Sequence, residues 1–115
     1  MKRIYIASPY TKGDIGINIR RQMDAFAELF NLGFLPFAPL LLHFQHIVHP
    51  LSYADCMRWD LGWLEMCDYV LRLEGESEGA DIEVARAREL GKPVFFTIEA
   101  MLLYLKANEK NEILN

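Results

Sequence analysis

A segment near residue 80 combines a small hydroxyl side chain, a glycine and a carboxylate at the start of a predicted helix. Ser77, Gly79 and Glu83 occur in the sequence SEGADIE. Backbone N–H groups at a helix N-terminus favour an anion, and the helix field lowers the pKa of a carboxyl group in the first turn. The segment therefore predicts either an ionised Glu83 that acts as a nucleophile, or a capping Ser77 whose acidic neighbours Asp81 and Glu83 only complement the helix dipole.

Asp60 lies among aromatic residues on a second predicted helix. Such neighbours would partly desolvate the carboxyl group and raise its pKa, as the role of proton donor requires. Together with Glu83 it would form the pair of carboxyl groups that retaining glycosyl transfer uses. The alternative is an aspartate on an exposed helix face, paired with Arg58 or Lys92.

Tyr5 and Tyr10 flank the end of the first predicted strand. Tyr5 belongs to the strand itself, where its ring would be buried and its hydroxyl would need a hydrogen-bond partner. A carboxylate at the neighbouring site could be that partner. The alternative is an ordinary tyrosine of the core.

Three histidines, His43, His46 and His49, follow one another at three-residue spacing. On a helix the first two would share a face and the third would be rotated away. The segment precedes Pro50 in a predicted loop, and neither cysteine of the chain has the spacing of a zinc motif. The sequence thus favours loop histidines at the rim of a polar crevice over a metal site. It also lacks the Walker A and G-x-G-x-x-G motifs, so no cofactor is expected.

The elements that must position these residues alternate between strand and helix patterns. Short apolar runs predict strands at 2–7, 34–38, 68–73 and 92–97. Apolar periodicity and capping residues predict helices at 17–31, 52–66, 79–90 and 99–108, and a loop is expected between 38 and 50. In the first helix the predicted buried face consists of Ile19, Met23, Phe26, Ala27 and Phe30. In the third helix it consists of Ile82, Ala85 and Ala87.

This alternation predicts a single α/β domain over residues 1–115, with a polar C-terminal tail from about 109 to 115. The expected architecture is a flavodoxin/Rossmann-like parallel sheet of about four strands in the order 2-1-3-4, with helices on both faces. In such a sheet ligands bind where the strand order reverses, at the carboxyl ends of the strands. The segments 8–14 and 74–83 are therefore expected to line the site.

Composition excludes several other classes of protein. The chain has 115 residues, 52% of them hydrophobic, and a formal net charge of −4. This fits one domain with an apolar core. The apolar runs are too short to span a membrane, and the acidic balance argues against a nucleic-acid partner. Two cysteines without an export signal indicate reduced thiols in a cytoplasmic protein.

Four blocks of the sequence resemble the nucleoside 2-deoxyribosyltransferase-like superfamily, which includes the 2′-deoxynucleoside 5′-phosphate N-hydrolases. They are IYIASPY at 4–10, WDLGWLEMCD at 59–68, the serine, glycine and glutamate at 77, 79 and 83, and ARELGKPV at 87–94. The resemblance covers residues 2–97. It rests on the order and the spacing of the four blocks within one short α/β chain.

The resemblance implies an enzyme that cleaves the N-glycosidic bond of a (deoxy)nucleoside or its 5′-monophosphate. Glu83 would attack C1′ and form a glycosyl-enzyme intermediate, Asp60 would handle protons at the base, and Tyr5 would orient the nucleophile. The intermediate would then be resolved by hydrolysis or by base exchange. The residues expected to contact the substrate are Ser8, Pro9, Tyr10, Thr11, Ser77 and Gly79.

Position 77 separates members of this superfamily. Nucleoside-transferring members have an acid there, and nucleotide-hydrolysing members have a serine, so Ser77 favours a nucleotide substrate and water as the acceptor. The first loop departs from the hydrolase pattern, because Pro9 and Thr11 stand where those enzymes have serine and arginine. Ser8, Thr11 and Lys12 could substitute, although a lysine is a point charge without the fork of an arginine.

The resemblance also implies a homo-oligomer, a dimer or larger, because a neighbouring subunit often completes the site in this superfamily. The exposed apolar part of the helix that carries Trp59 and Trp63 could form the contact. A hypothesis of another class remains open, namely a nucleotide-binding or sensor module on the same fold without catalysis.

Overall fold

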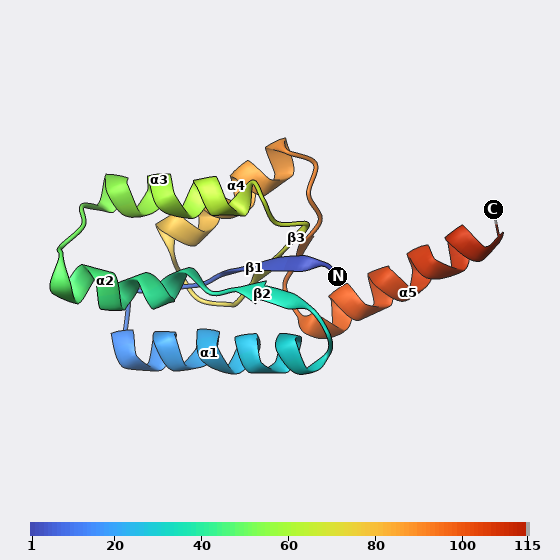
Figure 1. Cartoon of the computed structure of the whole chain (residues 1–115), viewed down its shortest axis with the longest axis horizontal. Coiled ribbons are helices and arrows are strands. Elements are labelled where there is room, and N and C mark those ends of the chain that lie inside the picture. Colours follow the sequence, from blue (N-terminus) through green and yellow to red (C-terminus); the bar gives the residue numbers. More distant parts are fainter. Residues whose placement is uncertain (115) are drawn as a thin grey trace.

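A parallel four-stranded sheet forms the centre of the molecule (Figure 1). The structure is a computed structural model that describes residues 1–114, with side chains through Glu109. The strands are β1 (Arg3–Ala7), β2 (Leu35–Phe37), β3 (Tyr69–Arg72) and β4 (Val94–Phe95). Their order is β2-β1-β3-β4, and each neighbouring pair is parallel. The predicted α/β class and the predicted strand order are both confirmed.

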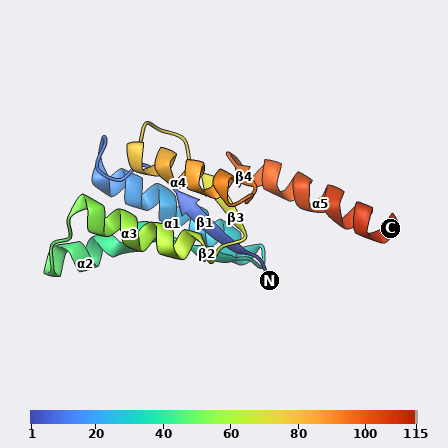
Figure 2. The same ribbon diagram turned by 90° about the horizontal axis from the view of Figure 1, so that it is seen from above.

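Helices cover both faces of this sheet. They are α1 (Ile15–Asn31), α2 (Leu42–Val48), α3 (Tyr53–Leu64), α4 (Glu78–Glu89) and α5 (Ile98–Leu114), with a 3-10 turn, η1 (Pro39–Leu41), before α2. Helices α1 and α5 share one apolar cluster with the sheet, and α3 and α4 share the other. The far half of α5 extends away from the body of the molecule (Figure 2), and the longest dimension is 51 Å.

Two segments differ from the sequence prediction. The predicted loop between residues 38 and 50 contains η1 and α2. Helix α2 has only seven residues, none of them buried, and so short a segment does not reveal an apolar period in the sequence. Helix α5 continues to Leu114, beyond the predicted end at 108. It therefore runs through most of the predicted polar tail at 109–115, whose side chains after Glu109 lie outside those described.

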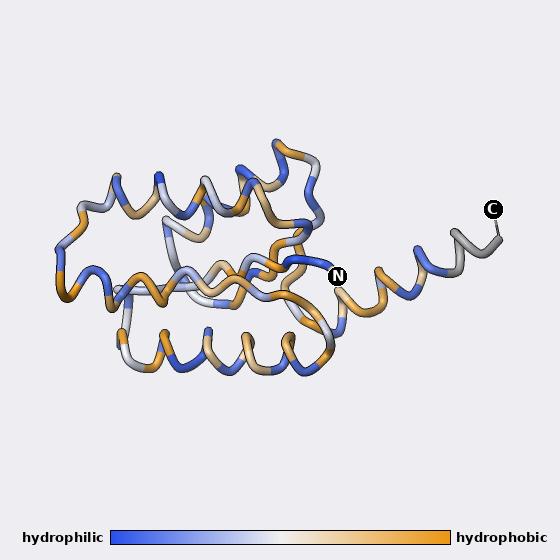
Figure 3. The backbone as a smooth tube through the Cα atoms, in the orientation of Figure 1, coloured by the Kyte–Doolittle hydropathy of each residue, from blue (hydrophilic) through white to orange (hydrophobic). Residues whose placement is uncertain are grey.

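The buried face of α1 is more polar than predicted. It consists of Asn18, Gln22, Ala25 and Leu29. Of the predicted face, Ala27 and Phe30 are exposed, and the other three residues are partly buried. Orange and blue residues alternate along α1 in Figure 3, as expected for an amphipathic helix. The face is shifted because the Gln22 amide is fully satisfied inside the protein, where it joins β1 to η1. It donates to the Ile6 carbonyl (3.1 Å) and to Ser8 Oγ (2.8 Å), and it accepts from the Leu40 N–H (2.8 Å).

Helix α4 shows a similar shift. Its buried residues are Ala80, Glu83, Val84 and Ala87, whereas Ile82 and Ala85 are exposed. Of the predicted inward residues, only Ala87 faces the core. Glu83 thus occupies a core-facing position, whereas the apolar pattern predicted its neighbours there.

Within residues 1–114, no helix is both long enough and apolar enough to cross a membrane.

Candidate active site

A cavity of about 880 Å³ opens beyond the carboxyl ends of β1 and β3. The segments that line it are the loop after β1, the loop after β3 with the first turns of α4, and parts of α2 and α3. Strand order reverses between these two strands, because β1 lies between β2 and β3. The cavity therefore occupies the position where ligands bind in open α/β sheets.

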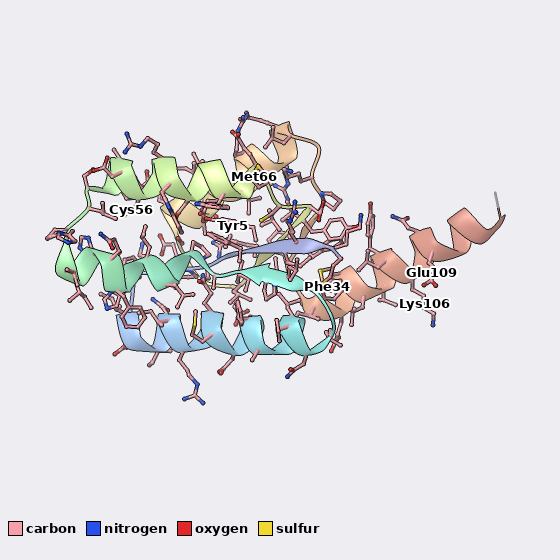
Figure 4. The ribbon with its side chains drawn as sticks, viewed as in Figure 1. Tyr5, Phe34, Cys56, Met66, Lys106 and Glu109 are labelled. Atoms are coloured by element: carbon pink, nitrogen blue, oxygen red, sulfur yellow. The ribbon has the colours of Figure 1, made fainter. Side chains whose placement is uncertain are left out.

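Glu83 and Tyr5 meet in the interior beside this cavity. Figure 4 shows Tyr5 between the sheet and α3. Its ring is fully buried, and its hydroxyl donates a hydrogen bond to Oε2 of Glu83. Glu83 is only 4% exposed, yet it still lines the cavity. Burial and the two nearby carboxyl groups raise the pKa of Tyr5, so the phenol keeps its proton as a donor. The expected carboxylate partner of Tyr5 is thus confirmed.

Asp60 also lines the cavity, on α3, and its Oδ1 atom is buried without a hydrogen-bond partner in the described structure. Burial raises the pKa of this carboxyl group to about 6. The alternative of a surface ion pair is wrong, because the two candidate cations bind elsewhere. Arg58 pairs with Asp55 at 3.6 Å, and Lys92 donates to backbone carbonyl groups just after α3.

The pKa of Glu83 is raised, in contrast to the predicted effect of the helix field. Burial is the largest cause and brings the pKa to about 8, and the charge of Asp60 acts in the same direction. The hydrogen bond from Tyr5 and the charge of Arg72 partly oppose this. Glu83 lies beyond the first turn of α4, which begins at Glu78. Loss of solvent there outweighs the helix dipole, whose effect fades within the first turn. The acid pair therefore retains a proton at a pH where isolated carboxyl groups have lost theirs.

Arg72 is a site residue that the sequence prediction missed. Its side chain is 8% exposed at the end of β3, and it donates to the carbonyls of Leu73 and Gly75 (2.8 Å to the latter) and to Asp81 Oδ1 (3.2 Å). It thereby fixes the loop between β3 and α4. The sequence feature that could have revealed Arg72 is a charged residue inside an otherwise apolar strand.

Gly75 allows this loop to pass close to the first one. Its φ is +121°, and a Cβ atom at this position would lie 2.7 Å from Cγ of Pro9. Any other residue would meet both backbone strain and a clash. Pro9 does not line the cavity, unlike the other first-loop residues predicted to contact substrate, Ser8, Tyr10 and Thr11. The role of Pro9 in this structure is to pack the two loops together.

Asn18 and Ser77 fix the two loops by hydrogen bonds. The buried amide of Asn18 donates to the carbonyls of Tyr10 and Lys12, both at 2.9 Å. Ser77 is the N-cap of α4, and its Oγ accepts from the Ala80 N–H at 3.1 Å. Ser77 is therefore a helix cap, as one interpretation of the sequence predicts, but Glu83 and Asp81 do more than complement the helix dipole, because they bond to Tyr5 and Arg72. Both Ser77 and Gly79 also line the cavity.

The three histidines separate in the structure. His43 and His46 lie on α2 and line the cavity, whereas the exposed His49 follows the helix and lies outside the cavity. Across the described part of the chain, no cluster of three or more potential ligands could hold a metal ion.

The charged residues of the cavity wall are mainly acidic. Its carboxyl groups belong to Asp60, Glu76, Glu78, Asp81 and Glu83. Lys12 is the only lysine or arginine among its described lining residues, and its Nζ lies 2.6 Å from Glu76 Oε1. This lysine, exposed like its partner, is thus already paired with an acid.

Comparison with known proteins connects this fold to solved structures. A structure reported under the heading of 2-deoxyribosyltransferase from Bacillus psychrosaccharolyticus aligns with a TM-score of 0.59 and 22% sequence identity. The alignment covers 80% of this chain and 69% of that one. At this level of identity the likeness shows a common fold. No curated protein matches the sequence closely enough to count as a relative.

One family model matches the sequence itself. It is described as a domain of unknown function, DUF7768, and it aligns with residues 2–97. The match spans all four strands and the helices from α1 to α4, and so includes both loops of the cavity. Because it covers most of the chain, the protein belongs to the DUF7768 family.

Proposed function

We propose that the protein cleaves the N-glycosidic bond of a (deoxy)nucleoside through a covalent intermediate on Glu83. The observation that carries this proposal is the cluster of Tyr5, Glu83 and Asp60 beside the cavity at the strand-order reversal. Two carboxyl groups with raised pKa values can divide the work of nucleophile and proton donor. The shared fold with a 2-deoxyribosyltransferase and the resemblance in sequence point to the same chemistry.

In the first step the proton that the acid pair retains passes from Glu83 to Asp60, and the Glu83 carboxylate then attacks C1′ of the sugar. The bond from C1′ to the base nitrogen breaks, its electron pair leaves with the base, and protonated Asp60 supplies the proton that neutralises the base. An ester between Glu83 and C1′ results. In the second step Asp60, now ionised, takes a proton from water, whose oxygen attacks C1′ and releases the Glu83 carboxylate. A second base that attacks in place of water gives base exchange.

Tyr5 and Arg72 favour the form of Glu83 that attacks. Both lower its pKa against the effect of burial, Tyr5 by a hydrogen bond and Arg72 by its charge. The Tyr5 hydrogen bond also fixes one carboxylate oxygen, which leaves the other to reach C1′. Tyr5 is thus a positioning residue for the nucleophile.

The charge of the cavity favours an uncharged nucleoside over its 5′-monophosphate. Glu76 and Asp81 are paired with Lys12 and Arg72, so the charges that a phosphate would meet are those of Glu78 and of the Asp60–Glu83 pair. The N–H groups at the start of α4 offer a phosphate some attraction, but the repulsion acts over a longer range. This charge opposes the preference for a nucleotide that Ser77 suggests, and the choice between the two substrates stays a prediction.

The decisive experiment measures release of free base from 2′-deoxynucleosides and from their monophosphates. We expect Glu83→Gln to lower turnover at least about 1,000-fold, equivalent to about 4 kcal/mol of transition-state stabilisation. Glu89→Gln, an exposed acid on the same helix, is the matched control and should retain activity. Full turnover by Glu83→Gln would disprove the mechanism. Tight nucleotide binding without base release would favour the non-catalytic module, and a labelled second base distinguishes exchange from hydrolysis.

We infer further that the molecule assembles into a homo-oligomer through an aromatic surface on α3. Phe37 packs against Trp59 and Trp63, with ring centroids 5.4 and 5.5 Å away. Trp63 nevertheless remains 48% exposed. Exposed aromatic clusters of this kind are typical of protein contacts. A monomeric mass for the wild type by light scattering would refute this contact, and Trp63→Glu should convert an oligomer to monomers.

A further inference from the structure

Helix α2 borders the cavity although it has no buried residue of its own. Two side-chain hydrogen bonds connect it to neighbouring segments. One joins His43 Nδ1 to the hydroxyl of Tyr10, and the other joins His46 Nδ1 to the N–H of Leu51 (2.9 Å). Both histidines line the cavity, and the cleavage mechanism above uses neither of them.

The hydrogen bond of His46 determines where its proton lies. The Leu51 N–H donates to Nδ1. This nitrogen therefore accepts with its lone pair and carries no proton. The neutral ring must then carry its proton on Nε2. Within the described residues, Nε2 of His46 has no hydrogen-bond partner in the protein. The side chain thus retains one N–H donor for a ligand.

The Nδ1 atom of His43 also has a hydrogen-bond partner. The hydroxyl of Tyr10 contacts its Nδ1, and a phenol is a strong donor towards an imidazole nitrogen. Burial raises the pKa of Tyr10, which keeps the phenol protonated. With the phenol as the donor, the His43 proton lies on Nε2, the ring nitrogen that is left for a ligand. The loop that carries Tyr10 is itself fixed by Asn18, so the orientation of the His43 ring is set from the first loop.

The same part of the cavity offers apolar surface. Leu42 begins α2, Leu51 follows it, and both line the cavity together with Leu40 and Met57. Two neutral N–H donors beside aliphatic side chains suit a flat ring with acceptor atoms on its edge. A nucleobase has this character, because its ring nitrogens and carbonyl oxygens accept hydrogen bonds while its faces are apolar.

We propose that His43 and His46 recognise the nucleobase, each donating an Nε2–H hydrogen bond to an acceptor atom on the edge of the base. This inference rests on the proposed function. Because Glu83 and the two histidines line the same cavity, a sugar held against Glu83 leaves its base in the cavity that α2 borders. The two histidines then determine which bases bind, while the acid pair performs the cleavage.

Carbocyclic 2′-deoxynucleosides test this proposal, because the carbon that replaces the ring oxygen prevents cleavage. Dissociation constants are measured by calorimetry at pH 7.5 for the adenine, guanine, cytosine and thymine analogues. We expect His46→Phe and His43→Phe each to weaken the tightest analogue about tenfold, as loss of one hydrogen bond predicts. The affinities of the four bases should also converge. His49→Gln, outside the cavity, is the matched control and should change none of them.

A conservative variant separates recognition from structure. His46→Gln keeps an N–H donor at about the position of Nε2 but loses the Nδ1 acceptor for Leu51. Binding within about threefold of wild type is expected if the donor to the base is what matters. Equal weakening by His46→Gln and His46→Phe would show that His46 acts only through Leu51 and would overturn the proposal, as would unchanged affinities in both phenylalanine variants.

The outcomes also distinguish this proposal from the proposed function. If wild-type protein releases base and Glu83→Gln does not, the proposed function stands whatever the histidine variants do. If neither the analogues nor natural nucleosides bind, both proposals fail together.

Discussion

The two faces of β1 are built for different purposes, although their residues alternate along one strand. Ile4 and Ile6 enter the apolar cluster under α1 and α5, whereas Tyr5 and Ala7 enter the cluster under α3 and α4. The first cluster is filled mainly by aliphatic and aromatic side chains. The second contains small residues and the tyrosine that donates to Glu83.

This difference shows how a small sheet separates stability from chemistry. Bulky side chains exclude water on one face and provide most of the hydrophobic stabilisation. On the other face small residues leave room for two acids, and Asp60 Oδ1 remains buried without a partner. Such a buried polar atom costs about 1–3 kcal/mol. The α3–α4 face therefore loses stability that the α1–α5 face must supply.

The largest effect is expected from damage to the apolar face. Leu29→Ala removes a fully buried side chain between α1 and the sheet, and should lower the free energy of unfolding by about 2–5 kcal/mol. Urea denaturation measures the change. Phe30→Ala is the control on the same helix, because this side chain is 58% exposed, and it should cost less than about 1 kcal/mol. Similar losses for both variants would contradict the assignment of the buried face.

A pH series tests the cost of the buried acids. The pKa of Glu83 rises from 4.5 in the unfolded chain to about 8 in the folded protein, so the folded state holds its proton more tightly. This contribution to stability is fully present below about pH 4.5 and is lost as the pH rises towards 8, with a slope of up to about 1.4 kcal/mol per pH unit.

Glu83→Gln isolates that contribution, since glutamine does not titrate. The difference in unfolding free energy between variant and wild type should move in favour of the variant from pH 5 to pH 8. Urea unfolding at each pH gives the difference. A difference that stays constant across this range would show that Glu83 ionises as freely in the folded protein as in the unfolded chain.

The smallest effect comes from two serine caps with hydrogen bonds of similar length. Ser77 caps α4 and Ser52 caps α3, with side-chain hydrogen bonds of 3.1 and 3.0 Å. Replacing either serine with alanine should cost about 1 kcal/mol of stability, measured by thermal unfolding. Only Ser77 lines the cavity, so only Ser77→Ala should change KM for a nucleoside. An equal change in KM for Ser52→Ala would mean that the effect comes from helix stability alone.

Local sequence patterns were enough to predict the order of the elements. Strand and helix periodicities depend on neighbouring residues, so β1, α1, β3 and α4 were each predicted close to their observed bounds. Right-handed crossovers then allowed few strand orders, and the predicted one is observed. The sequence predicts a loop where α2 lies, and places its histidines there, because seven residues are too few to reveal a helical period.

The sequence predicts part of the candidate site. It misses the contacts that depend on the path of the loops in the folded protein. The sequence placed Tyr5, Asp60 and Glu83 as candidates, and their roles in catalysis remain predictions. It did not indicate Arg72, whose contacts depend on the path of the loop after β3. It also gave Pro9 a substrate contact, whereas the structure uses this residue to pack against Gly75.

By itself the sequence determined the class of fold, the strand order and the edge of the sheet at which a site would form, because these follow from periodicity and chain connectivity. Only the tertiary structure decided which face of each helix turns inward, and with it whether Glu83 holds a proton. The ionisation of a carboxyl group depends on the solvent it loses and on charges such as Asp60 and Arg72, which belong to other elements of the fold. The burial of Glu83 and its distances from these two charges are set only when the chain has folded.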